Sequence, residues 1–348
     1  MPEEHIPEHT HRSIYIIIVA CAAVIITAFI LTYATPPADF RSGTIVHIEK
    51  DTTLSQIDNE LYDEHVIRSP FLFRIIVTVL GERKSVGAGD YFFENPENVW
   101  QVAYRLAHDE QDLSQVRVIL PEGITVREMG VIIGTDLSGS LTRGMAPAFT
   151  FDEKGFLASA STSEGYLFPD TYFFLPNVTP AAVITVLKNN FNEKIATLTP
   201  AIIAFQASIK TSNIAKSYPR TLANIVTMAS ILEREAISTI DRRIIAGILW
   251  KRLDASEPLQ VDAPFMYIMG KTSAELTLTD LATTSPYNTY NHTGLPPTPI
   301  GNPGLDALTA AVTPTATKYW YYVSDKAGVI HYAETYSEQE VNEAKYVE

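Results

Sequence analysis

Hydrophobic and polar positions divide the chain into an apolar N-terminal run, a region of short alternating segments and a longer region with helical periodicity. The run Ile14–Leu31 contains no charged residue. As a helix it would be about 27 Å long, close to a bilayer hydrocarbon core of about 30 Å. Acidic residues outnumber basic ones before it, unlike in a signal peptide. The pattern predicts an uncleaved transmembrane anchor over residues 13–34, preceded by a tail of residues 1–12, and Pro36 is expected to end the helix.

A weak repeat follows the predicted anchor. Its copies begin near Glu49, Glu94 and Pro121, and each combines a polar turn with apolar residues at helical spacing. Alternating segments such as 116–120 fit strands that lead into these helices. The repeat predicts a small α+β domain over residues 40–134. Its turns carry no residue that only ligand binding would explain, so a purely structural domain remains an alternative to a binding module.

The region from residue 135 onward is turn-rich at first and then mostly helical. Near its end, two short strands at Tyr319–Ser324 and Val329–Ala333 are expected to form a hairpin. The predicted fold class is therefore α+β: an N-terminal transmembrane helix, a small α+β domain, and a mostly helical second domain over 135–348 that ends in a short β-hairpin. Helical periodicity predicts helices before that hairpin at residues 179–197, 198–209, 219–236 and 239–253.

Composition and charge narrow the function classes. The net charge is -14, and no basic stripe is available to displace counterions from phosphates, which argues against a nucleic-acid partner. The single cysteine, Cys21, excludes an intrachain disulfide and cysteine-rich zinc sites. A carbohydrate substrate remains compatible, because sugars are bound by aromatic stacking and neutral hydrogen bonds.

Carboxylates are the candidates for catalysis, since the chain lacks a Gly-rich phosphate loop and the motifs of zinc peptidases and serine hydrolases. Glu233 lies on an expected helix beside an apolar stripe that includes Ile225 and Ala229. A carboxyl on such a stripe loses water, so its pKa should rise toward neutrality, as a general acid requires. Glu235 also has apolar neighbours and projects about 200° away from Glu233. Helix geometry alone therefore leaves open which glutamate faces a cleft.

Two further segments combine polar groups with aromatic residues. One runs from Glu164 to Tyr172, and its aromatic side chains could stack on sugar rings or simply pack in the core. The other is Tyr287–Tyr290, a run of neutral donors and acceptors that suits a polyhydroxylated and N-acetylated sugar but could equally be a structural turn. Prolines and glycines over residues 293–304 describe a rigid loop after it, and such loops commonly build sites.

The segments around Glu164, Glu233 and Tyr287 together resemble the endolytic murein transglycosylases of the MltG/YceG-like family. The resemblance selects Glu233, the first glutamate of an Ala-Ser-x-x-Glu-x-Glu pattern, as the catalytic residue. It also implies a LysM-like character for residues 40–134. The run after Gln260 departs from the family at Phe265, where many members have a threonine. The implied substrate-binding residues are Glu164, Tyr172, Gln260, Asp262, Tyr287, Asn288, Thr289 and Tyr290.

The expected function is that of a lytic transglycosylase, a lyase that cuts the MurNAc–GlcNAc bond of peptidoglycan and leaves 1,6-anhydroMurNAc ends. The family implies no metal or organic cofactor, a single-pass location in the plasma (inner) membrane with the catalytic domain outside the cytoplasm, and a partnership with the wall-synthesis machinery. Two alternatives stay open. A hydrolytic muramidase would need a second carboxylate, for which Glu164 or Asp262 is the candidate. A non-catalytic wall-binding anchor would only tether partners.

Overall fold

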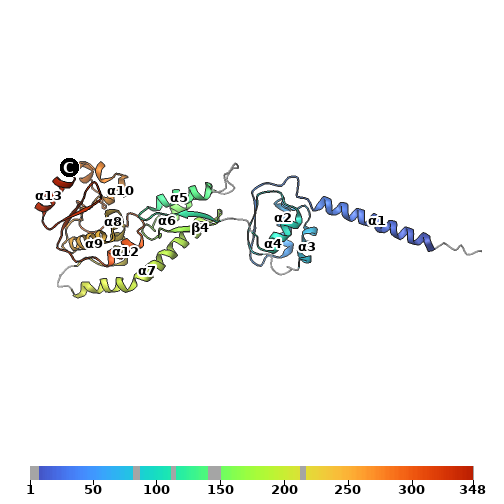
Figure 1. Ribbon diagram of the computed structural model, residues 1–348, viewed down its shortest axis with the longest axis horizontal. Helices are drawn as coiled ribbons and strands as arrows, with labels where there is room; N and C mark the ends of the chain where they lie inside the picture. The colour runs from blue at the N-terminus through green and yellow to red at the C-terminus, as the bar shows by residue number, and fades with distance from the viewer. Residues whose placement is uncertain (1–7, 81–86, 111–114, 140–149, 212–216, 348) are drawn as a thin grey trace, which may run out of the picture. The chain divides into compact units, whose positions relative to one another are not determined.

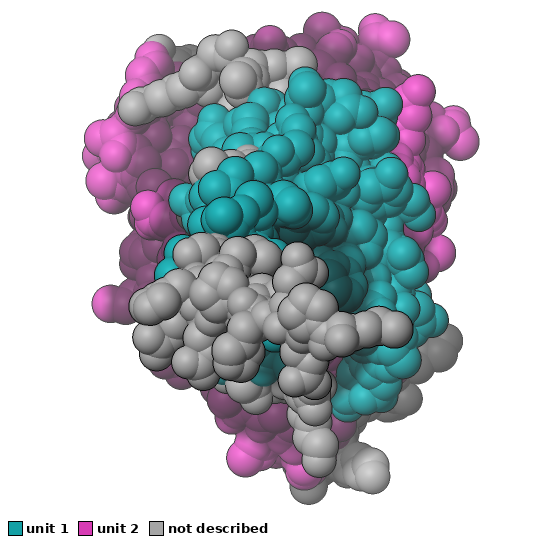
Figure 2. Space-filling model, turned by 90° about the vertical axis from the view of Figure 1, so that its right-hand side faces the viewer, with its two compact units in different colours: residues 1–114 teal, residues 115–348 magenta. Residues whose placement is uncertain are grey.

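The computed structural model describes residues 8–80, 87–110, 115–139, 150–211 and 217–347 (Figure 1). Within them the chain forms two compact units, Met1–Ser114 and Gln115–Glu348, which are coloured separately in Figure 2. Each unit has buried apolar clusters of its own. Small antiparallel sheets and many helices make up both, which agrees with the predicted α+β class.

Helix α1 (Glu8–Tyr33) occupies the place of the predicted anchor. Across the described residues, however, no helix is long and apolar enough to cross a membrane, so the structure supports the helix but not the predicted span. The chain after α1 is attached to the first unit. The Val99 N–H donates to the Ala34 carbonyl over 3.0 Å, and the Arg68 guanidinium donates to the Pro36 carbonyl over 2.8 Å.

Besides α1, the first unit contains a two-stranded antiparallel sheet and three helices around one core. Ile48, Leu61 and Phe73 are among its most deeply buried residues. The two helices that follow the repeated turns begin with capping boxes at Thr53 and Asn98, which satisfy backbone N–H groups that a helix start leaves unpaired. The elements are β1 (Thr44–Ile48), α2 (Leu54–Asp63), α3 (Pro70–Val79), β2 (Gly89–Phe93) and α4 (Val99–Ala107).

The third copy of the repeat belongs to the second unit. Its strand β3 (Val116–Ile119) pairs with β4 (Thr171–Phe174), and its helix α5 (Val126–Gly139) packs on the same core cluster. The two compact units divide after residue 114, whereas the sequence places a domain boundary near residues 110–135 and assigns residues 40–134 to the first domain. Local sequence could not reveal this difference, because a strand pattern does not say which distant strand will be its partner.

The second unit is mostly helical, as predicted, and ends in the expected hairpin of β5 (Tyr321–Ser324) and β6 (Ile330–Ala333). Asp325 accepts two backbone N–H groups in the hairpin turn, which Gly328 completes at a positive φ of 80°. Besides the strands and α5, the second unit contains α6 (Glu153–Ala160), α7 (Pro180–Thr211), α8 (Leu222–Glu235), α9 (Thr239–Asp254), α10 (Ala263–Met269), the 3-10 turn Ser273–Glu275, α11 (Leu278–Leu281), α12 (Leu305–Val312) and α13 (Tyr336–Tyr346).

Helix α7 corrects one prediction. Residues 179–197 and 198–209 were expected to form two helices, but α7 runs through Pro200 without a break. Ile195 precedes the proline and Ile202 follows it, and both pack on the same core cluster. Tertiary packing of this face outweighs the hydrogen bond that proline removes.

Helices α8 and α9 form an antiparallel pair that positions the candidate site. Arg242 at the start of α9 meets Glu233 at the end of α8, whereas Arg220, just before α8, meets Asp254 at the end of α9. Helix α12 packs against both of them (Figure 1). The end of α8 is thus held by two neighbouring helices, which gives a carboxylate there a rigid support.

Candidate active site

Glu233 lies in the last turn of α8, next to a face of the helix that is buried in the core. Its side chain is 5% exposed. One carboxylate oxygen accepts a hydrogen bond from Arg242 at 2.8 Å, and the other accepts the Gly304 N–H at 2.8 Å. Burial raises the pKa of this carboxyl, while the Gly304 hydrogen bond and the Arg242 charge oppose that shift.

Arg242 is fixed by three partners. Its guanidinium donates to Glu233, to Asp306 at 2.5 Å and to the Ala236 carbonyl at 2.9 Å. Only 7% of the residue is exposed. The planar fork of arginine suits this arrangement, because a lysine could not keep the same set of donor directions. Arg242 therefore fixes the orientation of the Glu233 carboxylate.

Asn302 joins three segments that are far apart in the sequence. Its amide oxygen accepts the N–H groups of Gly165 and Leu167, and its amide nitrogen donates to the Ile124 carbonyl and to Glu164 at 2.9 Å. Asn302 is fully buried, and all of these bonds lie within the second unit. The loop 299–304 is consequently held in place, which aims the Gly304 N–H at Glu233.

Glu164 is the second carboxylate of this cluster. It accepts hydrogen bonds from the Val126 N–H at 3.1 Å and from Asn302, and the Tyr267 hydroxyl lies 3.5 Å away. Burial raises the pKa of Glu164 to about 7, against the opposing effect of these hydrogen bonds. Close to neutral pH this group can either donate or accept a proton.

Glu235 points away from Glu233, as their helical spacing predicts. The Tyr322 hydroxyl of β5 donates to it at 2.7 Å, and burial raises its pKa to about 7, with a smaller contribution from Asp262. Asp262 in turn accepts the Tyr290 hydroxyl at 2.6 Å. These contacts join α8, α10 and the hairpin, which assigns Glu235 a structural position.

The Asn288-Thr289 pair stabilises the loop from inside. The Asn288 amide donates to the carbonyls of Leu281 and Thr283, and the Thr289 hydroxyl donates to the Val261 carbonyl, each at 2.8 Å. Both residues are at most 2% exposed. Their side chains therefore expose almost no surface in this chain, and their hydrogen bonds support a structural turn.

Gln260 is exposed and adopts a positive φ of 53°, and its side-chain oxygen accepts a hydrogen bond from Arg252. Its backbone N–H donates to the Thr289 carbonyl at 3.0 Å. The segment that contains Gln260 and Asp262 is therefore joined to the loop at 288–290.

Tyr287 and Tyr172 differ in position. The ring of half-buried Tyr287 lies 5.5 Å from that of Tyr267, which connects it with Glu164. Tyr172, by contrast, lies in β4 with 6% exposure, donates to the Phe168 carbonyl at 2.6 Å and packs in the core. The structure thus brings Tyr287 to the site and places Tyr172 outside its accessible surface.

Comparisons with known proteins extend this picture. The model of the YceG-like family matches residues 46–345. The chain belongs to the YceG-like family. Proteins named endolytic murein transglycosylase are similar to it: one from Bacillus subtilis is 33% identical over 185 residues, which cover 53% of this chain and 48% of that protein. One from Streptococcus pneumoniae is 29% identical over 256 residues, which cover 66% of this chain and 44% of that protein. The chain therefore spans about half the length of these relatives.

A crystal structure of a yceG-like protein from Listeria monocytogenes agrees with the fold. It matches with a TM-score of 0.51 and 26% identity, covering 86% of this chain and 99% of that one. The α+β architecture described above is thus shared with a solved member of the YceG-like family.

Sequence reasoning missed two residues of this YceG-like site, Arg242 and Asn302. Arg242 was hidden in a predicted helix without a distinguishing pattern. Asn302 lies in the loop 293–304 that the sequence marks as rigid, and an asparagine among prolines and glycines is the only local signal. The four hydrogen bonds of its side chain reach residues 135 to 178 positions earlier in the chain, which no local periodicity can indicate.

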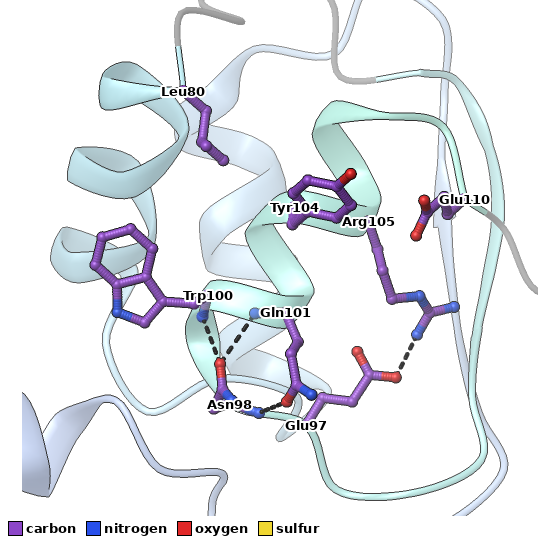
Figure 3. Close-up of a pocket in the computed structure, with 8 residues that line it drawn as sticks. All are labelled: Leu80, Glu97, Asn98, Trp100, Gln101, Tyr104, Arg105 and Glu110. Atoms are coloured by element: carbon purple, nitrogen blue, oxygen red, sulfur yellow. Dashed lines mark hydrogen bonds and ion pairs between the residues drawn. The ribbon is translucent and has the colours of Figure 1, made fainter.

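A separate cavity of about 510 Å³ lies in the first unit of this YceG-like chain (Figure 3). Trp100 and Tyr104 on α4 line it, about half exposed, together with Leu80 at the end of α3. Figure 3 shows an ion pair between Glu97 and Arg105 on its polar side, 2.6 Å long. Aromatic faces beside paired polar groups are a surface that can hold a sugar ring.

Proposed function

We propose that this YceG-like protein is an endolytic lytic transglycosylase that cuts the MurNAc–GlcNAc bonds of peptidoglycan glycan strands and ends nascent strands. The observation that carries the proposal is Glu233, a buried carboxyl whose pKa burial raises and whose two oxygens are oriented by Arg242 and Gly304. The names of the relatives from Bacillus subtilis and Streptococcus pneumoniae support the same activity.

In the proposed reaction Glu233 first acts as an acid. Its proton goes to the glycosidic oxygen, the bond from C1 of the muramoyl residue to that oxygen breaks, and the leaving sugar departs with a free hydroxyl. The Glu233 carboxylate then removes the proton of the muramoyl C6 hydroxyl, whose oxygen bonds to C1. The carboxyl is regenerated, a 1,6-anhydro ring forms and no water is consumed.

Glu233 suits this cycle because burial and the Arg242 charge shift its pKa in opposite directions. Burial favours the protonated form before the bond breaks, and the Arg242 charge favours the carboxylate that follows. An intramolecular attack by C6 needs a held sugar and excluded water rather than a second base.

Cleavage in oxygen-18 water tests the proposal. The full chain should release strand ends that are lighter by one water than reducing ends and that carry no label. The Glu233→Gln variant serves as the matched inactive control. Labelled reducing ends would instead indicate a hydrolytic muramidase. Glu164, whose pKa burial raises to about 7, would then be the second carboxylate.

For the first unit we propose a LysM-like role in binding the glycan, through the cavity that contains Trp100 and Tyr104. Trp100→Ala should weaken the binding of uncut strands by the Glu233→Gln chain. Phe71→Ala is the matched control, because Phe71 is an exposed aromatic residue of the same unit that does not line the cavity. Equal binding by both variants would contradict this role.

The proposed location is outside the cytoplasm at the plasma membrane, beside the machinery that synthesises the wall. The apolar side chains of α1, such as Ile17 and Ile25, are exposed in this chain and support contact with a membrane. Fractionation of cells should find the full chain with membranes and a chain without residues 1–33 in the soluble fraction. The full chain in the soluble fraction would contradict this location.

A further inference from the structure

A second cavity in the catalytic unit, of about 200 Å³, lies between the segment after α6 and helix α7. Ser163, Tyr166 and Thr162 line it from the segment, and Lys188 and Asn192 line it from one face of α7, with Phe191 between them. The cavity borders the proposed active site through one short stretch of chain. Glu164 is the neighbour of Ser163, and its carboxylate turns away to Asn302.

The polar side chains around this cavity lack partners within the part of the chain that the structure describes. Ser163 is 2% exposed, and its hydroxyl is buried without a hydrogen bond. Leaving a buried hydroxyl unpaired costs about 1–3 kcal/mol, so native proteins usually supply a partner. Lys188 forms no ion pair among the described residues. Several groups that can donate hydrogen bonds therefore line this cavity, and among the described residues no carboxylate lies there to balance the lysine charge.

The charge around the cavity indicates what kind of acceptor fits. Among the residues that the structure describes, no carboxylate lines it, although the chain has 40 acidic and 26 basic residues. One lysine, three hydroxyl groups and one amide are suited to a singly charged oxyanion such as a carboxylate. A phosphate dianion is more often matched by clustered arginines that bind two oxygens at once.

Resting on the proposed function, we propose that this cavity binds a free carboxylate of the peptide attached to the glycan strand. Lys188 would pair with the carboxylate, and the Ser163 hydroxyl would donate to it from inside the cavity. The site would then make the enzyme prefer strands that still carry their peptides. Lys188 and Ser163 would act as specificity residues, at a distance from the bond that Glu233 cuts.

The test compares strands that carry their peptides with strands stripped of them by an amidase, which keep only the lactyl carboxylate. For Lys188→Gln and Ser163→Ala, the ratio of kcat/KM on the two substrates should fall about tenfold, the size expected for losing a charge-assisted hydrogen bond. Lys188→Arg, which keeps the charge, should retain most of the ratio. Lys154→Gln, an exposed lysine on α6 outside the cavity, is the matched control.

If Lys188→Gln and Ser163→Ala leave the ratio of kcat/KM on the two substrates unchanged, the proposal is overturned. A direct binding measurement tests the peptide site separately from the proposed catalytic function. The full chain with Glu233→Gln should bind an acetylated dipeptide with a free C-terminal carboxylate about tenfold more tightly than its C-terminal amide, and Lys188→Gln should remove the difference. If the carboxylate and amide bind equally, the peptide site is wrong even where strand cleavage is confirmed. If the chain binds the carboxylate but never cuts strands, the catalytic proposal alone fails.

Discussion

Glu233 and Glu235 stand two positions apart on α8 and have different surroundings. Glu233 meets a guanidinium and a backbone N–H, whereas Glu235 meets one tyrosine hydroxyl inside the protein. A carboxyl that exchanges protons during a reaction needs access to substrate, and one that only supports packing does not. The contacts therefore separate a candidate for chemistry from a structural group.

The first prediction follows from that separation. Glu233→Gln should lower the rate of strand cleavage by about 10²–10⁴-fold, because glutamine keeps the shape but donates no catalytic proton. Glu235→Gln should keep most of the activity, since glutamine can still accept the Tyr322 hydroxyl. Turnover of purified variants checks both, with circular dichroism as the control for folding. A reversed order of the two losses would move the catalytic assignment to Glu235.

The second prediction concerns pH and stability. Burial raises the pKa of Glu235 to about 7 in the folded chain, above the value of about 4.3 for an unperturbed glutamate. Between these values the folded state holds more protons than the unfolded state, so stability should fall as pH rises from about 4.3 to about 7. In Glu235→Gln this part of the fall should disappear. Thermal unfolding from pH 4 to pH 8 measures it, and an unchanged slope would contradict the burial argument.

The third prediction concerns Arg242. Replacement by lysine keeps a positive charge but loses the three-way fork to Glu233, Asp306 and Ala236. Weaker stabilisation of the carboxylate should raise the pKa of Glu233 further. We expect kcat to fall about tenfold and the basic limb of its pH profile to move to higher pH. A loss of activity with an unmoved pH profile would indicate a structural role only.

At the residue scale the sequence could predict a desolvated carboxyl on α8, and the family resemblance selected Glu233 for it, but the sequence could not predict the partners of that carboxyl. The apolar stripe on α8 is a local pattern with a period of 3.6 residues, and it correctly places a carboxyl in a desolvated setting. The bonds of Asn302 connect loops that only the folded chain brings together. For the same reason Asn288 and Thr289 could not be recognised as buried supports of their loop.

At the element scale, the loop before α12 depends on close backbone approach. A Cβ added at Gly301 would lie 2.4 Å from the Gly123 carbonyl oxygen, which belongs to rigid backbone. The Gly123 N–H also donates to the Asn302 carbonyl at 2.8 Å, so the loop and the turn are joined at this point. Their contact sets the position of the Gly304 N–H against Glu233.

The fourth prediction is that Gly301→Ala separates the two segments. The cost in stability should be about 1–3 kcal/mol, as for other overpacked sites. Activity should fall further than stability at a temperature where the variant is fully folded, because the Gly304 N–H would lose its alignment. Chemical denaturation and turnover at one temperature measure both. If stability and turnover both stay at the wild-type values, the backbone at Gly123 can shift to accommodate the added methyl group, and the prediction is wrong.

Elements with local signals were predicted well, and elements that depend on distant partners were not. Polar turns followed by apolar residues at helical spacing marked helices α2 and α4, and each of these helices begins with a capping box. The pairing of β3 with β4, which moves the third copy into the second unit, has no local signal. The continuity of α7 through Pro200 likewise comes from packing on both sides of the proline rather than from its propensity.

At the scale of the whole molecule, the two units have separate cores, and the segment after α1 belongs to the first. The Val99 N–H and Arg68 bind the carbonyls of Ala34 and Pro36. The segment around Pro36 therefore does more than end the helix, because it is hydrogen-bonded to the first unit. A truncation that removes α1 should begin at Ala34, so that these two hydrogen bonds survive in the shortened chain.

The last prediction concerns the second unit alone. Residues 115–348 contain two buried clusters of their own, together with Glu233, Arg242, Asn302 and the loop 299–304. A chain of this size can bury enough surface to fold independently. We expect it to unfold cooperatively and to cut soluble glycan strands at a rate within about threefold of the full chain, because no residue of the proposed chemistry lies in the first unit.

On intact wall material the same fragment should be slower, since it lacks the aromatic cavity proposed to hold the glycan. Adding Trp100→Ala to the full chain should then reproduce part of that loss, while Phe71→Ala should not. Release of anhydro ends from both kinds of substrate measures the effect. A fragment that folds but cuts neither substrate would mean that the first unit contributes to catalysis itself, because its absence could not be explained by weaker attachment to the wall.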